Sequence, residues 1–328
     1  MKYRTLGETG LNVSEISLGT WQVGGKWGSE FNFKNAENII NTAIDNGVNF
    51  IDTADVYSEK LSEKIVGKVV RSRSEDVYIA TKCGRQLNPH NNEAYTPLVL
   101  RKFVEDSLSN LGIDRIDLIQ LHCPPTEVYY RPDIFALFDD LTKEGKIRNY
   151  GVSVQTVEEA LKAIEYEGVS TIQIIFNMFR QRPSELFFKE AKKKNVGILA
   201  RVPLASGLLT GKFNKATTFE KDDHRNFNRN GEAFDKGETF SGIDYNLGLK
   251  AVEELKQVFN NSESLAQKAL QWILTFNEIS CVIPGASSEE QVLSNINTYN
   301  AKSISDIEMQ KVNAIYTKYI KNQVHHLW

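Results

Sequence analysis

Residues 97–121 have the sequence PLVLRKFVEDSLSNLGIDRIDLIQL, and this stretch decides the fold. Its first part repeats apolar side chains at helical spacing, with Pro97 at the start and Gly112 just after the end, as helices prefer. Its last part, residues 116–121, is a short and mostly apolar run, which is typical of a strand buried on both faces of a parallel sheet. The stretch therefore predicts an amphipathic helix followed by a buried strand. The apolar stripe of the helix consists of Leu100, Phe103, Val104, Leu108 and Leu111.

The same alternation continues outward in both directions. Further helices are predicted at residues 35–46, at residues 156–164 behind a Thr-x-x-Glu capping box, and near residues 184–194. Between the helices lie eight short apolar runs that predict buried strands. These runs are residues 14–18, 48–51, 77–81, 116–121, 147–152, 172–176, 196–202 and 280–283.

Eight such units without a break in composition favour the α/β class and a closed (β/α)8 TIM barrel. A doubly wound open sheet is the alternative that the pattern leaves. The chain has 328 residues. A rule of about 150 residues per domain would suggest two domains, but barrels of this kind exceed that length as one domain. We therefore expect residues 1–328 to form a single domain.

Two segments fall outside the repeat. Residues 3–12 predict an N-terminal β-hairpin with a glycine-containing turn, covering one end of the barrel. Residues 205–245, after the seventh strand, are polar but contain five phenylalanines, which disordered linkers rarely carry. We interpret them as an ordered lid loop rather than a domain linker. The phenylalanines are Phe213, Phe219, Phe227, Phe234 and Phe240.

The composition excludes several classes of function. Lys and Arg number 39 and Asp and Glu 42, for a net charge of −3, which argues against a nucleic-acid-binding protein. No stretch is long and apolar enough to predict a membrane span. Three cysteines without a C-x-x-C pair indicate reduced thiols, and no ligand spacing predicts a metal site. We expect a cytoplasmic protein, and its oligomeric state stays open.

Ionisable groups follow three consecutive strands of the predicted barrel. The second strand leads into Asp52 and then Tyr57, the third leads into Lys82, and the fourth into His122. Because functional groups of a barrel collect where its strands feed the βα loops, we expect these four side chains to meet. Taken singly, each could be an ordinary hydrogen-bonded group on the barrel rim.

Together the four residues suit proton transfer at a carbonyl or alcohol oxygen. A free phenol titrates near pH 10. An ammonium group next to it, kept charged by a carboxylate, favours the phenolate and should lower the pKa of Tyr57. A neighbouring imidazole can donate a hydrogen bond that orients a carbonyl oxygen. The set contains no nucleophile or electrophile of its own, so a hydride-carrying cofactor would complete it.

Six segments in order along the chain carry a resemblance to a known family. Their sequences are IDTADVYSEKLSE (51–63), ATKCG (80–84), IDLIQLHCP (116–124), GKIRNYGVS (145–153), VPLASGLLTGKF (202–213) and VIPGASSEEQVLSNI (282–296). The chain resembles the aldo-keto reductase superfamily, in the bacterial branch with a Pro-Gly-Ala cofactor loop.

This resemblance implies a barrel enzyme that uses NADPH or NADH to reduce an aldehyde or ketone, or to oxidise an alcohol or sugar in reverse. It makes Tyr57 the proton donor, with Lys82 and Asp52 tuning it and His122 orienting the substrate. The substrate is then a small carbonyl or alcohol, with neither nucleic acid nor membrane as partner. It also implies a cofactor site formed by Gly19, Thr20, Trp21, Ser153, Gln173, Arg201, Leu204, Gly207, Leu209, Lys212, Arg225, Gly285, Ser287, Gln291 and Asn295.

The chain departs from the family pattern at four places. Val154 replaces the Asn that usually follows Ser153. Arg201 replaces the aromatic side chain that many members stack on the nicotinamide, and its charge could recruit an anionic substrate group. Ser58 and Lys60 replace the glycines of the family's Y-G-x-G loop. After the last strand, where NADPH-dependent members usually have Arg or Lys, residues 287–291 read SSEEQ.

The cofactor preference is therefore nearly balanced. Hydroxyl groups can bond the 2′-phosphate of NADPH, whereas the two glutamates repel it. Lys212 and Arg225 on the lid would compensate, so NADPH is expected and NADH is the alternative.

Two other interpretations stay open. The superfamily includes potassium-channel β-subunits, so a redox sensor or partner-binding subunit is the alternative function. The C-terminal VHHLW segment is expected to be either a packed tail or a segment that reaches a substrate pocket. An aromatic-lined pocket is also possible, and its candidates are Trp21, Trp27, Tyr129, Tyr130 and Trp328.

Overall fold

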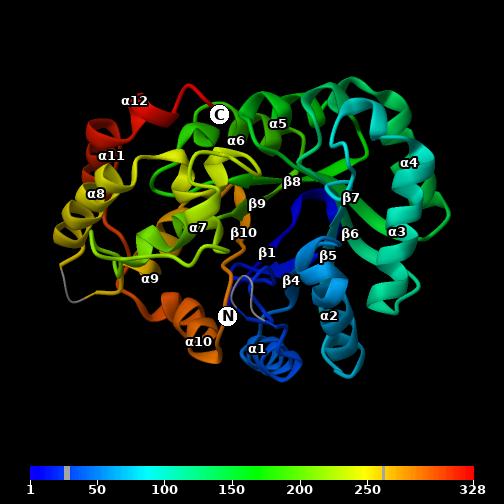
Figure 1. The fold of residues 1–328 in the computed structure, drawn as a ribbon, viewed down its shortest axis with the longest axis horizontal. Helices are drawn as coiled ribbons and strands as arrows, with labels where there is room; N and C mark the ends of the chain where they lie inside the picture. The colour runs from blue at the N-terminus through cyan, green and yellow to red at the C-terminus, as the bar shows by residue number, and fades with distance from the viewer. Residues whose placement is uncertain (26–29, 261–262) are drawn as a thin grey trace.

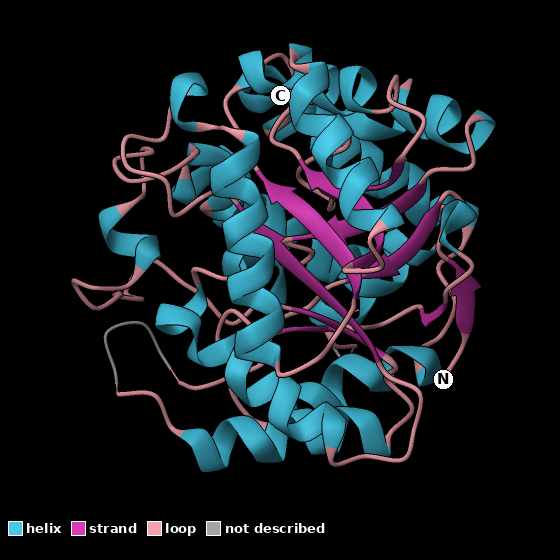
Figure 2. Ribbon diagram, turned by 90° about the vertical axis from the view of Figure 1, so that its right-hand side faces the viewer, coloured by secondary structure: helices cyan, strands magenta, loops and turns pink. Residues whose placement is uncertain are grey.

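A closed sheet of parallel strands forms the centre of the protein. The computed structural model describes residues 1–25, 30–260 and 263–328. In this part of the chain, eight strands pair in sequence order from β3 to β10 (Figures 1 and 2). Bridges between Ile16 and Val282 and between Gly19 and Gly285 join the first strand to the last. The strands are β3 (Leu18–Gly19), β4 (Phe50–Asp52), β5 (Tyr78–Cys83), β6 (Ile116–His122), β7 (Ile147–Ser153), β8 (Val169–Ile175), β9 (Gly197–Arg201) and β10 (Ile279–Val282).

These bridges close the sheet, which confirms the predicted (β/α)8 barrel. Helices form an outer layer around the strands (Figure 1), and their apolar faces pack against one continuous core. The helices are α1 (Phe33–Asp45), α2 (Leu61–Arg71), α3 (Pro97–Leu111), α4 (Pro132–Lys143), α5 (Val157–Ala163), α6 (Phe187–Lys193), α7 (His224–Phe227), α8 (Tyr245–Val258), α9 (Leu265–Leu274), α10 (Glu289–Ile296), α11 (Asp306–Tyr319) and α12 (Lys321–Val324).

Local sequence signals account for most helix ends. Helix α3 has the predicted bounds, with Thr96 capping its N-terminus and Gly112 in the left-handed conformation after its last residue. Helix α5 begins with the predicted capping box. The helix predicted near residues 184–194 is shorter, because Leu186 leaves the helical conformation between a 3-10 turn at Arg182–Ser184 and α6.

The predicted N-terminal hairpin is present at the amino end of the barrel strands. Strand β1 (Tyr3–Thr5) pairs antiparallel with β2 (Asn12–Ser14). Leu6, Leu11 and Val13 pack beneath the strands in a small separate cluster that includes Phe50 and Leu118. Hairpin residues thus fill the end of the barrel that lies opposite the βα loops.

Arg4 of the hairpin also binds the C-terminal part of the barrel. Its guanidinium group donates to the carbonyl oxygens of Leu274, Phe276 and Ile279 at 2.7–3.0 Å and pairs with Glu15 at 2.6 Å. The N-terminal hairpin and the last strand are therefore joined by one side chain.

The long segment after β9 is an ordered lid, as predicted. It contains α7 and several 3-10 turns, among them η7 (Lys236–Glu238). Its aromatic side chains pack on one another, with Phe219 5.3 Å from Phe213 and 5.8 Å from Phe240 between ring centroids. Burial of these rings explains why so polar a segment folds.

The C-terminal tail packs against this lid. Trp328 is 6% exposed, and its ring lies 3.9 Å from the Arg180 guanidinium carbon. Its indole Nε1 donates to Asp235 of the lid at 3.1 Å. Of the other candidate pocket aromatics, Tyr130 is 65% exposed, and Trp27 lies outside the described residues.

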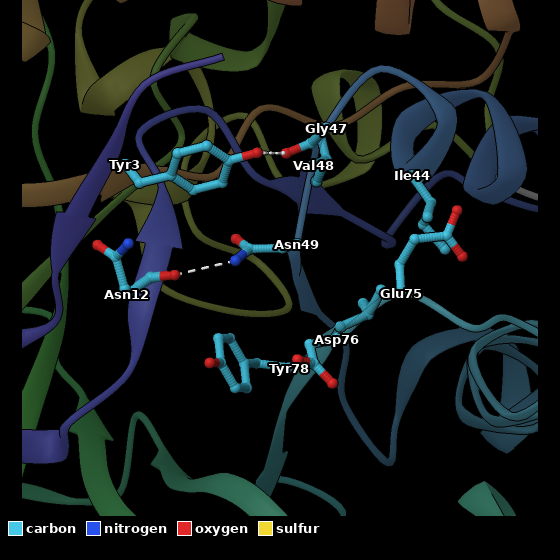
Figure 3. A pocket seen from close by; sticks show the side chains of 10 residues that line it. Tyr3, Asn12, Ile44, Gly47, Val48, Asn49, Glu75, Asp76 and Tyr78 are labelled. Carbon is cyan, nitrogen blue, oxygen red and sulfur yellow. Dashed lines mark hydrogen bonds between the residues drawn. The ribbon is translucent and has the colours of Figure 1, made fainter.

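A cavity of about 350 Å³ lies at the amino end of β4 and β5, beside the hairpin (Figure 3). Tyr3 donates to Gly47 O at 2.9 Å, and Asn49 donates to Asn12 O at 2.9 Å. None of the four residues predicted for proton transfer lines this cavity. None of the described helices is long and apolar enough to cross a membrane.

Candidate active site

The barrel register brings the predicted site residues to one end of the sheet. Asp52 is the last residue of β4 and pairs with Gly19 of β3. His122 and Ser153 end β6 and β7 and pair with each other, and Ser153 also pairs with Gln173 of β8. Because parallel strands present their carboxyl ends at the same edge, these side chains surround one opening of the barrel.

Lys82 links two of the predicted groups. Its Nζ donates to Asp52 Oδ1 at 2.5 Å, to the carbonyl oxygen of Thr53 at 2.8 Å and to Tyr57 Oη at 3.3 Å. Lys82 is 1% exposed and Asp52 3% exposed. Burial alone would lower the pKa of Lys82, but Asp52 and Tyr57 raise it above its usual value, so the ammonium group stays charged.

Asp52 has two further donors that hold its second oxygen. Gln173 Nε2 lies 2.8 Å from Asp52 Oδ2 and Gln120 Nε2 lies 3.4 Å from it. Gln173 was predicted as a cofactor contact, and in this structure its amide binds Asp52. The prediction omitted Gln120, although a glutamine inside the apolar run IDLIQL was a visible signal.

His122 lies next to the phenol of Tyr57. The two ring centroids are 6.0 Å apart, with an edge-to-face angle of 83°. Burial lowers the pKa of His122 well below its usual value, and the positive charges of Arg85 and Lys82 lower it further. The imidazole is therefore neutral at pH 7. Among the described residues, its buried Nδ1 has no hydrogen-bond partner.

The expected lowering of the Tyr57 pKa does not occur in this structure. Burial raises the pKa of Tyr57 above its usual value, and the opposing effect of Lys82 is smaller. The lysine acts in the predicted direction, but removal of the phenol from water outweighs it. Tyr57 consequently holds its proton at neutral pH.

The loop after Tyr57 explains why glycines are common there in the family. Ser58, Glu59 and Lys60 all have positive φ angles, of 46°, 53° and 73°. Residues other than glycine adopt this left-handed region of backbone conformation at a cost of about 1–3 kcal/mol each. The serine and lysine that replace glycine thus keep the loop conformation and add backbone strain beside the phenol.

The residues predicted to contact the nicotinamide fall into two groups. Trp21 contacts other aromatic rings of the site, whereas Thr20 and Ser153 are buried among the strand ends. Trp21 lies 6.3 Å from Tyr57 and 4.8 Å from His224 between ring centroids. Thr20 is fully buried, and its hydroxyl donates to Asp52 O at 3.0 Å. Ser153 is 1% exposed, with its hydroxyl 3.6 Å from Cys123 Sγ. Thr20 and Ser153 therefore support the strand ends from within.

Arg201 ends β9 and faces the lid. Its Nη2 donates to Val154 O at 3.0 Å, and its Nη1 lies 3.7 Å from Glu238 Oε1. Arg85, in the loop after β5, donates to the same Glu238 oxygen at 3.0 Å. The sequence analysis did not identify Arg85 or Glu238. Arg85 lies in a loop after β5, and Glu238 is a lid residue 37 positions beyond β9, so neither has a fixed place in the repeat.

The predicted lid contacts lie along the turn after β9. Leu209 is fully buried, Leu204 partly so, and Lys212 is exposed. Gly207 has φ +93°, which favours glycine. Arg225 is bound by Asp223, with Nη2 2.5 Å from Oδ2 and Nε 2.9 Å from Oδ1. This lid cation is therefore already neutralised.

The remaining predicted contacts surround the start of α10. Gln291 Oε1 accepts from the Ser287 N–H at 2.9 Å, and Asn295 Nδ2 lies 3.5 Å from Gly285 O. Glu289 points toward α1, where Thr42 donates to it at 2.8 Å. Within the described residues, no cluster of three or more His, Cys, Asp or Glu suggests a metal site.

The family model described as "Aldo/keto reductase family" matches residues 15–317. The chain belongs to the aldo/keto reductase family. An aldo-keto reductase of Bacillus subtilis, YhdN, is 32% identical over 96% of this chain and 95% of its own length.

Two other comparisons place this aldo/keto reductase among proteins of different description. A glycerol dehydrogenase structure from Gluconobacter oxydans has a TM-score of 0.79 and 30% identity, covering 97% of this chain and 96% of its own. A probable voltage-gated potassium channel β-subunit of Arabidopsis thaliana is 28% identical over 90% of both chains. Enzymes and channel subunits thus share this family's fold over nearly their whole length.

Proposed function

We propose that this aldo/keto reductase interconverts a carbonyl compound and its alcohol with a nicotinamide cofactor, and that Tyr57 handles the proton. The observation that carries the proposal is the buried contact series from Asp52 through Lys82 to Tyr57, with separations of 2.5 and 3.3 Å. A charged ammonium group beside a phenol stabilises the phenolate that forms when the proton leaves.

Each of the four residues has a separate task in this proposal. Tyr57 is protonated at neutral pH and donates its proton to the carbonyl oxygen during reduction. Lys82 stabilises the resulting phenolate, and Asp52 keeps the ammonium group charged and oriented. The neutral imidazole of His122 donates a hydrogen bond to the carbonyl oxygen without adding a second positive charge beside Lys82.

The residues around the strand ends fit a nicotinamide cofactor. His122 Nδ1 and Arg201 Nε are buried and have no hydrogen-bond partner within the described residues. Both nitrogens can therefore form hydrogen bonds with a bound molecule. A Cβ atom at Gly285 would meet no other atom closer than 3.9 Å, which leaves room along the loop after β10. A bound reduced nicotinamide would supply the hydride, while Trp21, Arg201 and the lid would hold its ring and phosphates.

For the cofactor we propose NADPH, with NADH as the alternative. Arg225 pairs with Asp223, which reduces its attraction for the 2′-phosphate. Glu289 accepts a hydrogen bond from Thr42 of α1, which reduces its repulsion of the phosphate. Lys212, which is exposed, remains to favour the phosphate, whereas the hydroxyls of Ser287 and Ser288 bind Gln291 at the start of α10. Replacing Lys212 with Met should therefore weaken NADPH binding more than NADH binding.

The experiment that tests the function begins with cofactor binding. Intrinsic fluorescence is followed while purified protein is titrated with NADPH and then NADH, and turnover is measured with small aldehydes, ketones and polyols. Binding of at least one cofactor and oxidation or reduction of at least one substrate are expected. Binding of neither cofactor would contradict the proposal.

A partner-binding subunit is the second candidate, favoured by the similarity to the Arabidopsis channel β-subunit. All four proton-transfer residues are in place, which favours an enzyme. The rate of cofactor release separates the two candidates. An enzyme must release its cofactor in every turnover, whereas a partner-binding subunit that senses the redox state retains it.

A further inference from the structure

A buried cluster of opposite charges lies between the lid and the candidate active site. Glu238 of η7 accepts from Arg85 at 3.0 Å and lies 3.7 Å from Arg201 Nη1. The side chains of Glu238 and Arg201 are each 11% exposed, and that of Arg85 is 20% exposed. The loop after β5 and the last residue of β9 therefore present guanidinium groups to a single carboxylate of the lid.

This cluster acts electrostatically on the proton-transfer residues. After burial, the charges on Arg85, Lys82 and Arg201 are the next causes that lower the pKa of His122. Burial raises the pKa of Tyr57, and Glu238 adds to that effect. Geometry agrees with this proximity, because Arg201 Nη2 lies 3.5 Å from Sγ of Cys123, the residue directly after His122. A substrate bound at Tyr57 and His122 would therefore have these arginines beside it.

The cluster contains more donors than its carboxylates can satisfy. Arg180, a third arginine nearby, donates from Nη2 to Gln155 O at 2.9 Å, while Asp235 binds the indole of Trp328. In the described part of the chain, Arg201 Nε and Arg180 Nη1 are buried without an acceptor. Because such groups cost about 1–3 kcal/mol each, one glutamate does not complete this site.

We propose that Arg85 and Arg201 bind a carboxylate group of the substrate, and that Glu238 occupies this position while the substrate is absent. Glu238 marks this position, because its Oε1 lies 3.0 Å from Arg85 Nη1 and 3.7 Å from Arg201 Nη1, where an oxygen of a substrate carboxylate would bind. The inference rests on the proposed function and names its substrate class, which is an aldehyde or ketone, or the matching alcohol, that carries a carboxylate.

The lid holds Glu238 through contacts to its backbone rather than to its carboxylate. Ser206 Oγ donates to Glu238 O at 2.9 Å and accepts from the Phe240 N–H at 3.2 Å. Phe240 and Ser241, two and three residues after Glu238, have left-handed conformations, with φ of 51° and 57°. In the proposal, the Glu238 side chain turns away from the arginines when a substrate carboxylate enters. The Ser206 contacts would persist, because they involve the backbone of Glu238 and Phe240.

The test compares two aldehydes of equal carbon number, 4-oxobutanoate and butanal, with the preferred cofactor. We expect a higher kcat/KM for 4-oxobutanoate in the wild type. In Arg85→Gln the ratio of the two kcat/KM values should fall about tenfold or more, because a hydrogen bond between charged groups is lost. Arg101→Gln is the control, since it removes an exposed arginine that pairs with Glu144 at 2.7 Å on the outer helices.

Glu238→Gln tests directly whether the Glu238 carboxylate occupies the position of the substrate carboxylate. Removing the internal carboxylate should lower the KM for 4-oxobutanoate several-fold and change that for butanal less. Should this variant fail to fold, succinate and succinamide replace it as probes of the wild type. Succinate should then inhibit butanal reduction competitively, and the uncharged succinamide should not.

Four outcomes overturn the inference. They are an equal loss for both aldehydes in Arg85→Gln, a higher KM for 4-oxobutanoate in Glu238→Gln, equal inhibition by succinate and succinamide, and a preference for glyceraldehyde 3-phosphate over 4-oxobutanoate, which would make the site one for phosphate. Reduction of butanal in any of these cases leaves the proposed function standing. Failure to reduce any carbonyl compound would contradict the proposed function itself.

Discussion

At the scale of single residues, the charge of each group at the strand ends depends on its neighbour. Asp52 keeps Lys82 charged, and Lys82 partly offsets the effect of burial on Tyr57. His122 stays neutral because it is buried among cations. This arrangement gives a protonated phenol and a neutral imidazole at pH 7, as carbonyl reduction requires.

Replacement of Tyr57 with Phe tests the proton step. We expect kcat to fall by about 10²–10⁴, the usual contribution of general acid catalysis, while the Kd for the cofactor stays within about twofold. Steady-state turnover and fluorescence titration measure the two quantities. Tyr3→Phe is the matched control, because it removes a hydroxyl bonded to Gly47 O at the far end of the barrel. Full turnover by Tyr57→Phe would exclude the mechanism.

Asp55 should make stability depend on pH. Burial and the charge of Glu63 raise its pKa to about 7, although Gln86, Lys60 and Lys82 act in the opposite direction. A carboxyl group whose pKa is raised by folding binds more protons in the folded state, so stability falls as pH rises from about 4 to about 7.

Between pH 5 and pH 8 the free energy of unfolding of the wild type should therefore drop by about 2–3 kcal/mol relative to that of Asp55→Asn. Urea unfolding at the two pH values measures this difference. A parallel pH dependence in both proteins would show that Asp55 titrates near its ordinary pKa.

The sequence predicted the positions of site residues at strand ends better than those of residues inside strands or on the lid. Asp52, Lys82 and His122 could be placed because each ends or nearly ends an apolar run, whose position in the barrel is fixed by the repeat. Gln120 was overlooked because it lies inside a strand. Glu238 could not be placed at all, since its location depends on how the lid packs its aromatic side chains.

At the scale of elements, close helix packing depends on individual glycines. Gly67 lies inside α2, where glycine normally weakens a helix by about 0.5–1 kcal/mol relative to alanine. Here a Cβ atom would lie 2.0 Å from the carbonyl oxygen of Leu111 at the end of α3. The two helices can approach this closely only because the side chain is absent.

Gly67→Ala should therefore destabilise the protein by about 1–3 kcal/mol, against the intrinsic preference of the helix. Thermal unfolding followed by circular dichroism measures the change. Lys68→Ala, at an exposed position of the same helix, is the control and should change stability little. A gain in stability for Gly67→Ala would mean that α2 and α3 can separate without loss.

The C-terminal tail should set the mobility of the lid. Trp328→Ala removes the ring that packs on Arg180 and the donor to Asp235. We expect faster cofactor release in stopped-flow experiments and faster proteolysis within residues 205–245. Trp328→Phe keeps a smaller aromatic ring near Arg180 but loses the indole N–H, so it should show a smaller effect. Unchanged release and proteolysis in Trp328→Ala would rule out this role.

At the scale of the whole molecule, we propose that residues 1–328 act as one domain, with Arg4 as a tie between its two ends. Arg4→Ala leaves three carbonyl oxygens without their donor, and we expect a loss of about 2–4 kcal/mol in the free energy of unfolding. Chemical denaturation gives the value, and Arg101→Ala is again a surface control. One cooperative transition is expected in both, and two separate transitions would contradict the single domain.

The alternation of apolar runs predicted the barrel because strand order follows sequence order almost throughout. It could not predict how the barrel closes, since closure uses bridges at Ile16 and Gly19 rather than a long strand. Those bridges require residues 16–19 to meet residues 282–285 at the other end of the sequence, which no local pattern encodes.

The same closure sets the timing of folding on the ribosome. Arg4 and its partner Ile279 are 275 residues apart. At synthesis rates of about 5–20 residues per second, the hairpin leaves the ribosome roughly 15–50 s before its partner strand is made. During that interval Ile16 and the first barrel strands have an open edge. The first barrel strands of a nascent chain therefore stay unpaired on one side until residues 279–285 have been synthesised.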